Sequence, residues 1–233
     1  MSSNIGVMGH TIGHTKSPIF QQAGLNELGI DETFEAWDVL PEDLEAKVAT
    51  FREKGFIAAC VTLPHKQAVI PMVDELTEAA ESVGAVNWIF NRDGKLIGHN
   101  TDCNGFLRAL KEKAGFDPKG ADAVVFGAGG AARAIVYALK TAGVNRLTIA
   151  NRTVEKAQAL ANDFSEGRFK PTATGMSRDE LSNYVPYANL LVNTTSLGMA
   201  GGPAELATPA TADMISADAV GYDAVYAPPM TKF

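Results

Sequence analysis

Hydrophobic positions along this chain fall into short runs rich in β-branched residues, separated by longer stretches in which apolar and polar residues mix. The runs 5–8 and 124–126 have the composition of buried strands. Because strands that alternate with helices form mostly parallel sheets covered on both faces, the pattern predicts an α/β fold. The expected strands are 5–8, 34–39, 56–62, 85–90, 124–126, 146–150, 188–192 and 220–225, with a hairpin from 92 to 97.

Helices are expected in the stretches between these runs. The first begins at Ser17-Pro18, with Ser17 as its N-cap, and ends near Gly29. A second begins at Pro41 and ends at about Lys54, before a glycine. Further helices are expected before Gly84, over 104–114 and on both sides of the strand at 146–150, whereas 198–213 is dense in Gly, Pro, Ala and Thr and is expected to be a loop.

The segment Val-Val-Phe-Gly-Ala-Gly-Gly-Ala-Ala-Arg-Ala at 124–134 has the strongest chemical signal. It predicts a strand, a tight turn and a helix start with the spacing G-x-G-x-x-A. Gly127 allows the turn, Gly129 lets a pyrophosphate approach the backbone, and Ala132 lets the helix pack closely. The helix N-terminus would then face the phosphates. We interpret the segment as a dinucleotide-binding turn, with a purely structural turn as the alternative.

The end of the next expected strand indicates which dinucleotide is bound. Sites for NAD usually place Asp or Glu there, where it accepts hydrogen bonds from the ribose 2′-hydroxyl. This chain has Asn151 followed by Arg152, with Lys156 one helical turn later. A guanidinium binds a 2′-phosphate through two hydrogen bonds, whereas a carboxylate repels it, so the pattern favours NADP. The alternative is that the two cations are solvated charges at a helix start, where cations are mildly unfavourable without an anion.

Composition excludes several classes of protein. The chain has 233 residues, 46% hydrophobic and 20% charged, with a formal net charge of −7, which suits two modest globular domains. The acidic balance argues against nucleic-acid or membrane partners, and no apolar run approaches the roughly 20 residues of a membrane span. Cys60 and Cys103 lie far apart, and the histidines and cysteines form no ligand spacing. We therefore expect no metal and a reduced, cytoplasmic protein.

Polar side chains collect in loops that follow the strands of the first half. Ligands of parallel sheets bind outside the carboxyl ends of the strands. Hydroxyl, amide, ammonium and carboxylate groups in such loops suit a small polyhydroxylated substrate. Asn87 is also notable, because an amide within an apolar strand needs partners. The candidate loops are 14–17, 60–66 and 98–102, with Thr15, Ser17, Thr62, Lys66 and Asp102 as their chemically active members.

Each of these residues also has a purely structural interpretation. Ser17 suits a helix cap, Lys66 a solvated lysine at a helix start, and Asp102 the N-cap of the helix expected from Asn104. His65 belongs to a residue type that packs or caps more often than it catalyses. Residue spacing alone therefore leaves a binding site and a set of structural loops equally open.

Taken together, these motifs resemble those of the shikimate dehydrogenase family over nearly the whole chain. The resemblance implies reversible reduction of 3-dehydroshikimate to shikimate with NADPH, in aromatic amino-acid biosynthesis. It also implies a mostly parallel α/β substrate domain over 1–103 and a Rossmann-like NADP-binding domain over 104–226. The matching segments are 14–18, 61–66, 84–87 and 98–102 in the first half, and 127–134, 151–153, 193–199 and 223–228 in the second.

The resemblance also implies roles for single residues. Lys66 and Asp102 would be the catalytic pair: the ammonium stabilises the charge that develops on the ketone oxygen and supplies a proton, and the carboxylate orients it. Thr15, Ser17, Thr62, Asn87 and Tyr226 would hold the substrate. The cofactor would be held by Gly127, Ala128, Gly129, Gly130, Ala131, Asn151, Arg152, Thr153 and Lys156, with Thr194 and Met199 along the ribose and nicotinamide.

Three features depart from the family pattern. Thr15 replaces the usual serine, and Cys103 and Asn104 follow Asp102 where many relatives have glycine first. Relatives continue with a Gly-x-x-Met-Leu segment and helices that return to the first domain. We expect 227–233 to be the start of this return to the first domain, with its remainder missing from the sequence. Quinate or an aminated analogue as substrate, NAD as cofactor, and a non-catalytic NADPH-binding role stay open as alternatives. A monomer and a homodimer are both compatible with the sequence.

Overall fold

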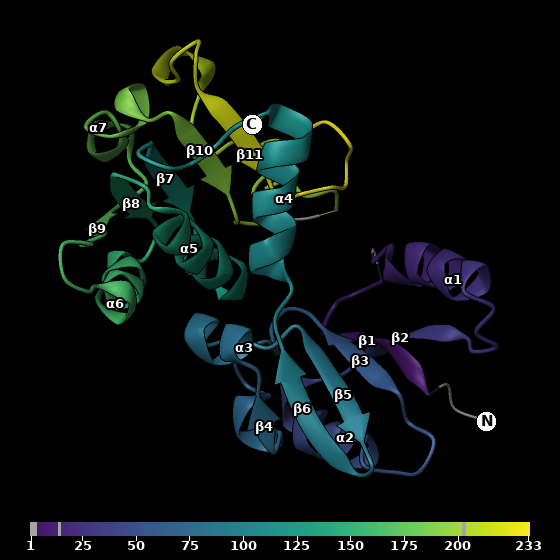
Figure 1. Ribbon diagram of the computed structural model, residues 1–233. Helices are drawn as coiled ribbons and strands as arrows, with labels where there is room; N and C mark the ends of the chain where they lie inside the picture. The colour runs from purple at the N-terminus through teal and green to yellow at the C-terminus, as the bar shows by residue number, and fades with distance from the viewer. Residues whose placement is uncertain (1–3, 14, 202–203) are drawn as a thin grey trace. The chain divides into compact units, whose positions relative to one another are not determined.

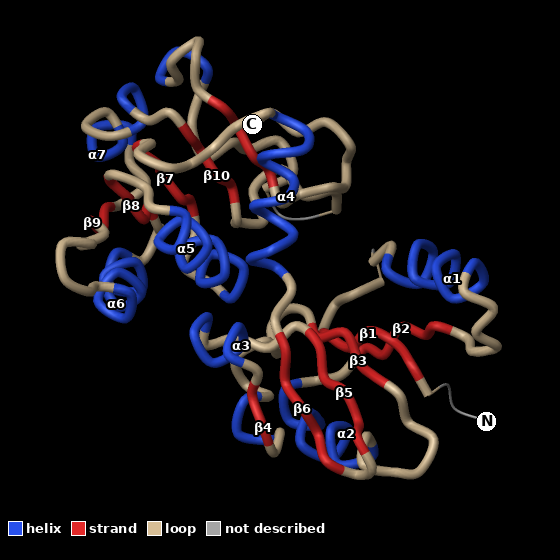
Figure 2. Tube along the Cα trace, in the orientation of Figure 1, coloured by secondary structure: helices blue, strands red, loops and turns tan. Residues whose placement is uncertain are grey.

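The computed structural model describes residues 4–13, 15–201 and 204–233, and the chain divides into two compact units, the second beginning at Asp102. Each unit is a β-sheet with helices packed on it (Figure 1). Strands and helices alternate along both units (Figure 2), which confirms the α/β fold predicted from the hydrophobic pattern.

The first unit contains a six-stranded sheet in the order β2-β1-β3-β5-β6-β4. Strand β5 runs antiparallel to β3 and β6, and all other neighbouring strands are parallel. The ends of β1, β3 and β6 therefore lie at the same sheet edge as the beginning of β5. The strands are β1 Ile5–Gly9, β2 Phe34–Asp38, β3 Ala58–Val61, β4 Glu75–Leu76, β5 Trp88–Arg92 and β6 Lys95–His99.

Helices pack on both faces of this sheet, because successive strand residues point to opposite sides. Val7 of β1 belongs to an apolar cluster with Leu25 of helix α1, whereas Met8 belongs to a second cluster with Leu44 of α2. Both faces of β1 are thus buried. The helices are α1 Ser17–Glu27, α2 Leu44–Thr50 and α3 Glu78–Val83, with the 3-10 turns η1 Pro41–Asp43 and η2 Ile70–Met72.

The second unit contains five parallel strands in the order β11-β10-β7-β8-β9. The chain order reverses between β7 and β10, the switch point at which nucleotides bind in Rossmann-like sheets. The expected Rossmann-like fold is confirmed. The elements are α4 Asp102–Ala114, β7 Asp122–Phe126, α5 Gly130–Ala142, β8 Arg146–Ala150, α6 Val154–Phe164, β9 Thr172–Thr174, α7 Arg178–Leu181, η3 Val185–Tyr187, β10 Leu190–Asn193, η4 Ala212–Met214 and β11 Val220–Asp223.

Two apolar layers enclose this second sheet. Val125 of β7 packs in a cluster with residues of α4, α5 and α6, and Val124 packs in a separate cluster with residues of α7, η3 and η4. Both faces of β7 are therefore buried. This explains why its sequence is continuously apolar rather than alternating.

Several element boundaries differ from those expected in the sequence, and two of them lie beside candidate site residues. The strand expected at 85–90 begins at Trp88, because the backbone amide of Val86 donates to the carbonyl of Lys66 at 2.7 Å instead of joining the sheet. Helix α4 begins at Asp102 rather than at Asn104. As a result, Asn87 immediately precedes β5, and Asp102 is the first residue of α4.

The start of α1 also differs from the prediction. Lys16 is the N-cap and makes no side-chain cap, while Ser17 is the first helical residue. The helix-cap interpretation of Ser17 is therefore wrong. Between 164 and 188, where the hydrophobic pattern is weak, the structure has β9 and α7, and α7 starts with a capping box of Ser177 and Glu180.

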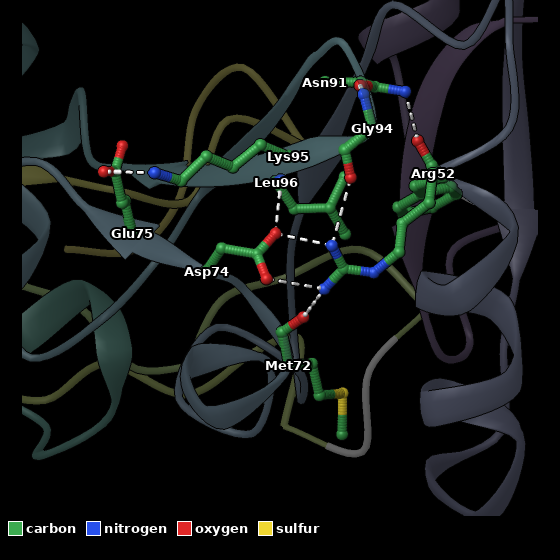
Figure 3. Close-up of polar contacts among 9 residues, drawn as sticks. Arg52, Met72, Asp74, Glu75, Asn91, Gly94, Lys95 and Leu96 are labelled. Carbon is green, nitrogen blue, oxygen red and sulfur yellow. Dashed lines mark hydrogen bonds and ion pairs between the residues drawn. The ribbon is translucent and has the colours of Figure 1, made fainter.

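A polar cluster around Arg52 connects the segment after α2 to the segments around β4 and β6 of the first sheet (Figure 3). The guanidinium donates to both carboxylate oxygens of Asp74 at 2.5 and 3.2 Å, and to the carbonyls of Gly94 and Met72 at 3.1 and 3.3 Å. The amide of Leu96 donates to Asp74 at 2.7 Å. Hydrogen bonds from Arg52, followed by that amide, lower the pKa of the Asp74 carboxyl.

We expect Arg52→Ala to lower the Tm of the first unit by a few degrees at pH 7, because a carboxylate and two carbonyls lose their shared donor. Since the pKa of Asp74 is lowered in the folded state, its stabilising effect is complete above the unfolded pKa and is lost as the pH falls toward the lowered value. The difference in Tm should therefore narrow below about pH 4. Both tryptophans, Trp37 and Trp88, belong to the first unit, so tryptophan fluorescence reports its unfolding.

Arg92→Ala is the matched control for this measurement, because Arg92 is an exposed arginine of the same unit outside the polar cluster. It should change the Tm little at any pH. Equal losses of Tm in the two variants, or a difference in Tm that does not depend on pH, would contradict a stabilising role of the Arg52 cluster.

Candidate active site

The expected substrate residues of the first unit lie at one edge of its sheet. Thr62 follows β3, Lys66 lies in the turns after it, and Asn87 immediately precedes β5. Because β5 is antiparallel to its neighbours, its beginning lies beside the ends of β3 and β6. The sheet topology therefore brings these three residues to a common edge, although they are far apart in the sequence.

The hydroxyls of Thr15, in the loop that follows β1, and of Ser17, the first residue of α1, lie next to each other. Thr15 Oγ1 donates to Ser17 Oγ at 3.2 Å and accepts from the Ser17 amide at 3.3 Å. Both residues are partly buried. The candidate His14 lies outside the described residues. The two hydroxyls offer donors and acceptors for a hydroxyl or carboxylate of a substrate.

Asn87 clamps the loop after β6. Its side-chain amide donates to Thr101 Oγ1 at 2.9 Å, and its carbonyl oxygen accepts from the Thr101 backbone amide at 3.0 Å. The residue is only 5% exposed, so these bonds satisfy polar atoms in an apolar setting. Asn100 adds a further bond to the same segment, from its side chain to the carbonyl of Ala85 at 2.9 Å. Asn87 therefore holds the residue that immediately precedes Asp102.

Lys66 is joined to the same clamp through the backbone. It is partly buried, and its carbonyl accepts from the amide of Val86, the residue before Asn87. The Asn87 carbonyl in turn accepts from the amide of Val61 at the end of β3. Hydrogen bonds therefore link the segments that carry Lys66, Asn87 and Thr101 to one another.

Asp102 is the first residue of α4 and belongs to the second unit. Burial, with a smaller contribution from the negative charge of Asp102, raises the pKa of the Tyr222 phenol on β11. The same two causes raise the pKa of the Cys103 thiol. The carboxylate of Asp102 therefore lies within electrostatic reach of the β11 side of the second sheet.

The glycine turn of the second unit follows β7 and requires glycine at its first position. Gly127 has φ +112°, in the region that L side chains rarely adopt, and a Cβ atom there would collide with Thr194 Oγ1. The Thr194 hydroxyl donates to the carbonyl of Phe126 at 2.7 Å. The turns after β7 and β10 are thus packed against each other at the switch point of the sheet.

The N-terminus of α5 lies directly after this turn. Its N-cap is Gly129, which offers no side chain to cap the first backbone amides. A Cβ atom at Gly129 would meet nothing within 4 Å, so the space above this backbone is open. Uncapped amides, the positive end of the helix dipole and open space suit a phosphate group. Ala128, Gly130 and Ala131 complete the turn and the first helical residues.

The end of β8 carries no carboxylate. Asn151 follows the strand, and its side-chain amide donates to the carbonyl of Thr153 at 2.9 Å. Thr153 is the N-cap of α6 and makes no side-chain cap. Arg152 and Lys156 are exposed on either side of this helix start. Two cations beside uncapped amides suit an anion, such as the 2′-phosphate of NADP, and the residues present therefore fit that cofactor.

Asn193 shapes the two remaining loops, a role that the sequence analysis missed. The residue is fully buried at the end of β10, and its side-chain amide donates to Asp223 at 2.9 Å and to the carbonyl of Leu197 at 3.2 Å. Its side-chain oxygen accepts from the amide and hydroxyl of Thr195 at 3.0 and 2.7 Å. An amide at the end of an apolar strand was the available sequence signal.

These loops carry the last three expected site residues. Thr194 and Met199 lie in the partly buried loop after β10, and Tyr226 is 54% exposed in the loop after β11. The second unit thus groups the glycine turn, Asn151 with its neighbours and Thr194 at the carboxyl ends of its parallel strands. Met199 lies further along the loop after β10, and Tyr226 lies in the loop after β11.

A separate cavity of about 400 Å³ opens at the other end of the second sheet. It is lined by the first residues of β7 and β8 and by Phe169, Tyr184 and Tyr187. The glycine turn follows the last residue of β7, so this cavity does not belong to the candidate nucleotide site.

Within the described ranges, no three His, Cys, Asp or Glu side chains gather as a metal site. Neither Cys60 nor Cys103 forms a disulfide in the part of the chain that the structure describes. None of the described helices combines the length and the apolar character needed to cross a membrane.

Comparisons with known proteins point to one family. Residues 7–89 match the model of the shikimate dehydrogenase substrate binding domain, and residues 109–198 match that of shikimate / quinate 5-dehydrogenase. A shikimate dehydrogenase (NADP(+)) from Methanopyrus kandleri is 43% identical over 230 residues, which are 98% of this chain and 79% of that protein.

Two solved structures are similar throughout the chain. Shikimate 5-dehydrogenase from Thermus thermophilus, in complex with NADP(H) and shikimate, has a TM-score of 0.84 at 35% identity, over 98% of this chain and 81% of that one. Quinate dehydrogenase from Corynebacterium glutamicum, in complex with NAD, has a TM-score of 0.86 at 31% identity, over 98% and 82%. The fold, the motifs and these relatives agree, and the chain belongs to the shikimate dehydrogenase family.

Proposed function

We propose that this member of the family catalyses the reversible reduction of 3-dehydroshikimate to shikimate with NADPH. The observation that carries the proposal is the pairing of two chemistries in one chain. The first unit gathers hydroxyl, amide and ammonium groups at one sheet edge. The second unit presents uncapped helix starts, one of them beside Arg152, to phosphates. Relatives described as NADP-dependent shikimate dehydrogenases support this assignment.

The cofactor would be held by the second unit. The open backbone at Gly129 and the first amides of α5 would bind the pyrophosphate, and Arg152 and Lys156 would bind the 2′-phosphate. Thr194 and Met199 would line the ribose and nicotinamide. When bound, NADPH supplies the hydride that reaches the ketone carbon of the substrate. Gly127, Ala128, Gly130, Ala131, Asn151 and Thr153 would complete this cofactor site.

The substrate would be held mainly by the first unit. Thr15, Ser17 and Thr62 offer hydroxyls to the substrate's own hydroxyls and carboxylate, and Tyr226 would add a phenol. Asn87 would contribute its amide while it clamps Thr101. Hydroxyl-rich binding of this kind discriminates strongly against analogues that lack a hydroxyl, because the buried polar groups are then left unpaired.

Lys66 and Asp102 would perform the proton chemistry. Hydride arriving at a ketone carbon leaves negative charge on the oxygen, which the Lys66 ammonium stabilises and protonates. Asp102 would accept a hydrogen bond from the hydroxyl that this oxygen becomes, and it would orient the Lys66 ammonium. In the direction of shikimate oxidation, neutral Lys66 takes the hydroxyl proton. The hydrogen bonds between Asn87 and Thr101 support this assignment, because they fix the residue before Asp102. The residue before Asn87 is itself bonded to the Lys66 carbonyl.

A pair of glycine variants tests the cofactor site. Gly129→Ala should leave stability nearly unchanged, because its Cβ meets nothing within 4 Å, but should raise the Kd of NADPH at least tenfold by blocking the pyrophosphate. Gly127→Ala should lose both binding and about 2 kcal/mol or more of stability, because of its positive φ and the collision with Thr194. NADPH fluorescence titration and urea unfolding followed by circular dichroism measure the two effects. Unchanged NADPH affinity in Gly129→Ala would remove this turn from the cofactor site.

The proposed reaction is tested by spectrophotometric assay of the purified chain. NADPH formation from NADP and shikimate is the expected result. Turnover of quinate with NAD would support the alternative of a quinate/shikimate dehydrogenase, which the similarity to a quinate dehydrogenase bound to NAD favours. Binding of NADPH without turnover of shikimate, quinate or an aminated analogue would support a non-catalytic NADPH-binding protein instead.

Two further properties belong to the same proposal. Cysteines without a disulfide, as Cys60 and Cys103 are among the described residues, are typical of a reducing compartment, which supports a cytoplasmic location. We expect a monomer or a homodimer, and light scattering on a sizing column distinguishes the two. Apolar residues exposed on α1, Ile19 at 73% and Phe20 at 58%, favour self-association at high concentration.

A further inference from the structure

His65 is a buried polar residue that the proposed mechanism does not use. Its side chain is 1% exposed, in the turn between Thr62 and Lys66. The imidazole Nε2 lies 2.7 Å from the carbonyl oxygen of Val39. Because a carbonyl oxygen only accepts hydrogen bonds, Nε2 carries the proton and donates it. The imidazole therefore connects the turn after β3 to the segment after β2.

Val39 is held in place independently of His65. Its backbone amide donates to the carbonyl of Gly9, at the end of β1, at 2.8 Å. Its side chain is buried in the apolar cluster that contains Met8. The acceptor of the His65 bond is thus anchored to the central strands of the sheet, and it provides a fixed reference point for the turn.

Backbone groups of His65 and Lys66 both form hydrogen bonds. The amide of His65 donates to the carbonyl of Thr62 at 2.9 Å, and its carbonyl accepts from Val69 at 3.1 Å. The Lys66 carbonyl accepts from Val86 at 2.7 Å. The first two bonds lie within the turn, so they set its shape but not its position against β2. Backbone bonds from Thr62 to Met8 and from His10 to Leu63, both 2.9 Å, hold the start of the turn to the end of β1. The imidazole bond to Val39 ties the residue before Lys66 to the segment after β2.

We propose that His65 is a positioning residue for Lys66: its bond to the Val39 carbonyl fixes the turn from which the Lys66 ammonium reaches the substrate. The inference rests on the proposed function, in which Lys66 stabilises and protonates the developing alkoxide. The position of the Lys66 Cα matters because the lysine side chain is long and flexible. A misplacement of about 1 Å at a reacting group can cost on the order of 100-fold in rate.

Two substitutions at His65 separate positioning from packing. His65→Phe keeps a buried ring and removes the donor, whereas His65→Gln places an amide N–H near the position of Nε2. We expect His65→Phe to lower kcat for shikimate oxidation at least tenfold, with the KM for shikimate and the Kd of NADPH changed less than threefold. His65→Gln should recover kcat to within about threefold of the wild type. His65→Met is a second donor-free variant in case the phenylalanine does not fold.

A measurement on Lys66 itself keeps this inference separate from the proposed function. The rate at which acetic anhydride modifies Lys66, relative to exposed Lys54, is followed by mass spectrometry in each variant. We expect a change of at least threefold in the donor-free variants and recovery in His65→Gln. Unchanged labelling of Lys66, or equal effects of His65→Phe and His65→Gln, would overturn the positioning role even in an active enzyme. A wild-type chain that does not turn over shikimate would overturn the proposed function, and the labelling comparison would still decide the inference.

Discussion

Lys66→Ala should lower kcat for shikimate oxidation by on the order of 1,000-fold while changing the KM for shikimate only a few fold. The ammonium acts mainly on charge that develops in the transition state, so its loss affects turnover more than ground-state binding. The truncation should leave the fold intact, because Lys66 is only partly buried and backbone groups make the hydrogen bonds that hold its turn. Initial rates at saturating NADP, with shikimate varied, measure both constants.

Lys54→Ala is the control for this prediction, since Lys54 is an exposed lysine at the end of the same unit's α2 region. It changes the net charge by the same amount and should leave both constants within twofold of the wild type. Turnover retained in Lys66→Ala would exclude Lys66 from the chemistry. A rise in KM with kcat unchanged would instead assign Lys66 to substrate binding alone.

Arg152→Asp should raise the Kd of NADPH about 100-fold and leave the Kd of NADH nearly unchanged. The variant removes charge-assisted hydrogen bonds to the 2′-phosphate and adds a repelling carboxylate at the end of β8. The two cofactors differ only in this phosphate, so the ratio of their Kd values isolates the contact. Fluorescence titrations with both reduced cofactors, at low and high salt, provide the measurement; the effect should shrink as salt screens the charge.

Arg168→Asp is a matched control, because it introduces the same charge change at an exposed arginine of the same unit. Arg168 lines the cavity at the opposite end of the second sheet. It should weaken NADPH binding less than threefold. Equal weakening by the two variants would show a general effect of net charge, and it would contradict a 2′-phosphate contact at Arg152.

The cofactor half of the candidate site has signals that are local in the sequence. A glycine at a positive φ, an uncapped helix start and the residue type at a strand end are all properties of a few consecutive residues, as Gly127, Gly129 and Asn151 show. The alternating and continuous apolar runs likewise predict the strands, because side-chain direction repeats every two residues. The α/β class and the Rossmann-like half therefore followed from short-range pattern.

The prediction was weaker where hydrogen-bond partners are distant in the sequence. Asn87 could be singled out as an amide in need of partners, but its partner Thr101 became visible only with the antiparallel β5 between β3 and β6. Asn193 and Asp223 were missed as a pair for the same reason, since they meet across neighbouring strands. Short apolar strands do not specify which neighbour they pair with.

The chain's local pattern was thus sufficient for the fold class, the glycine turn and the preference for a phosphorylated cofactor. The tertiary structure alone revealed the Asn87 clamp, the bond from His65 to Val39 and the buried Asn193. The physical reason is the same in each case. A buried polar side chain must find a partner, but the identity of that partner depends on which strands and loops the completed sheet brings within hydrogen-bond distance.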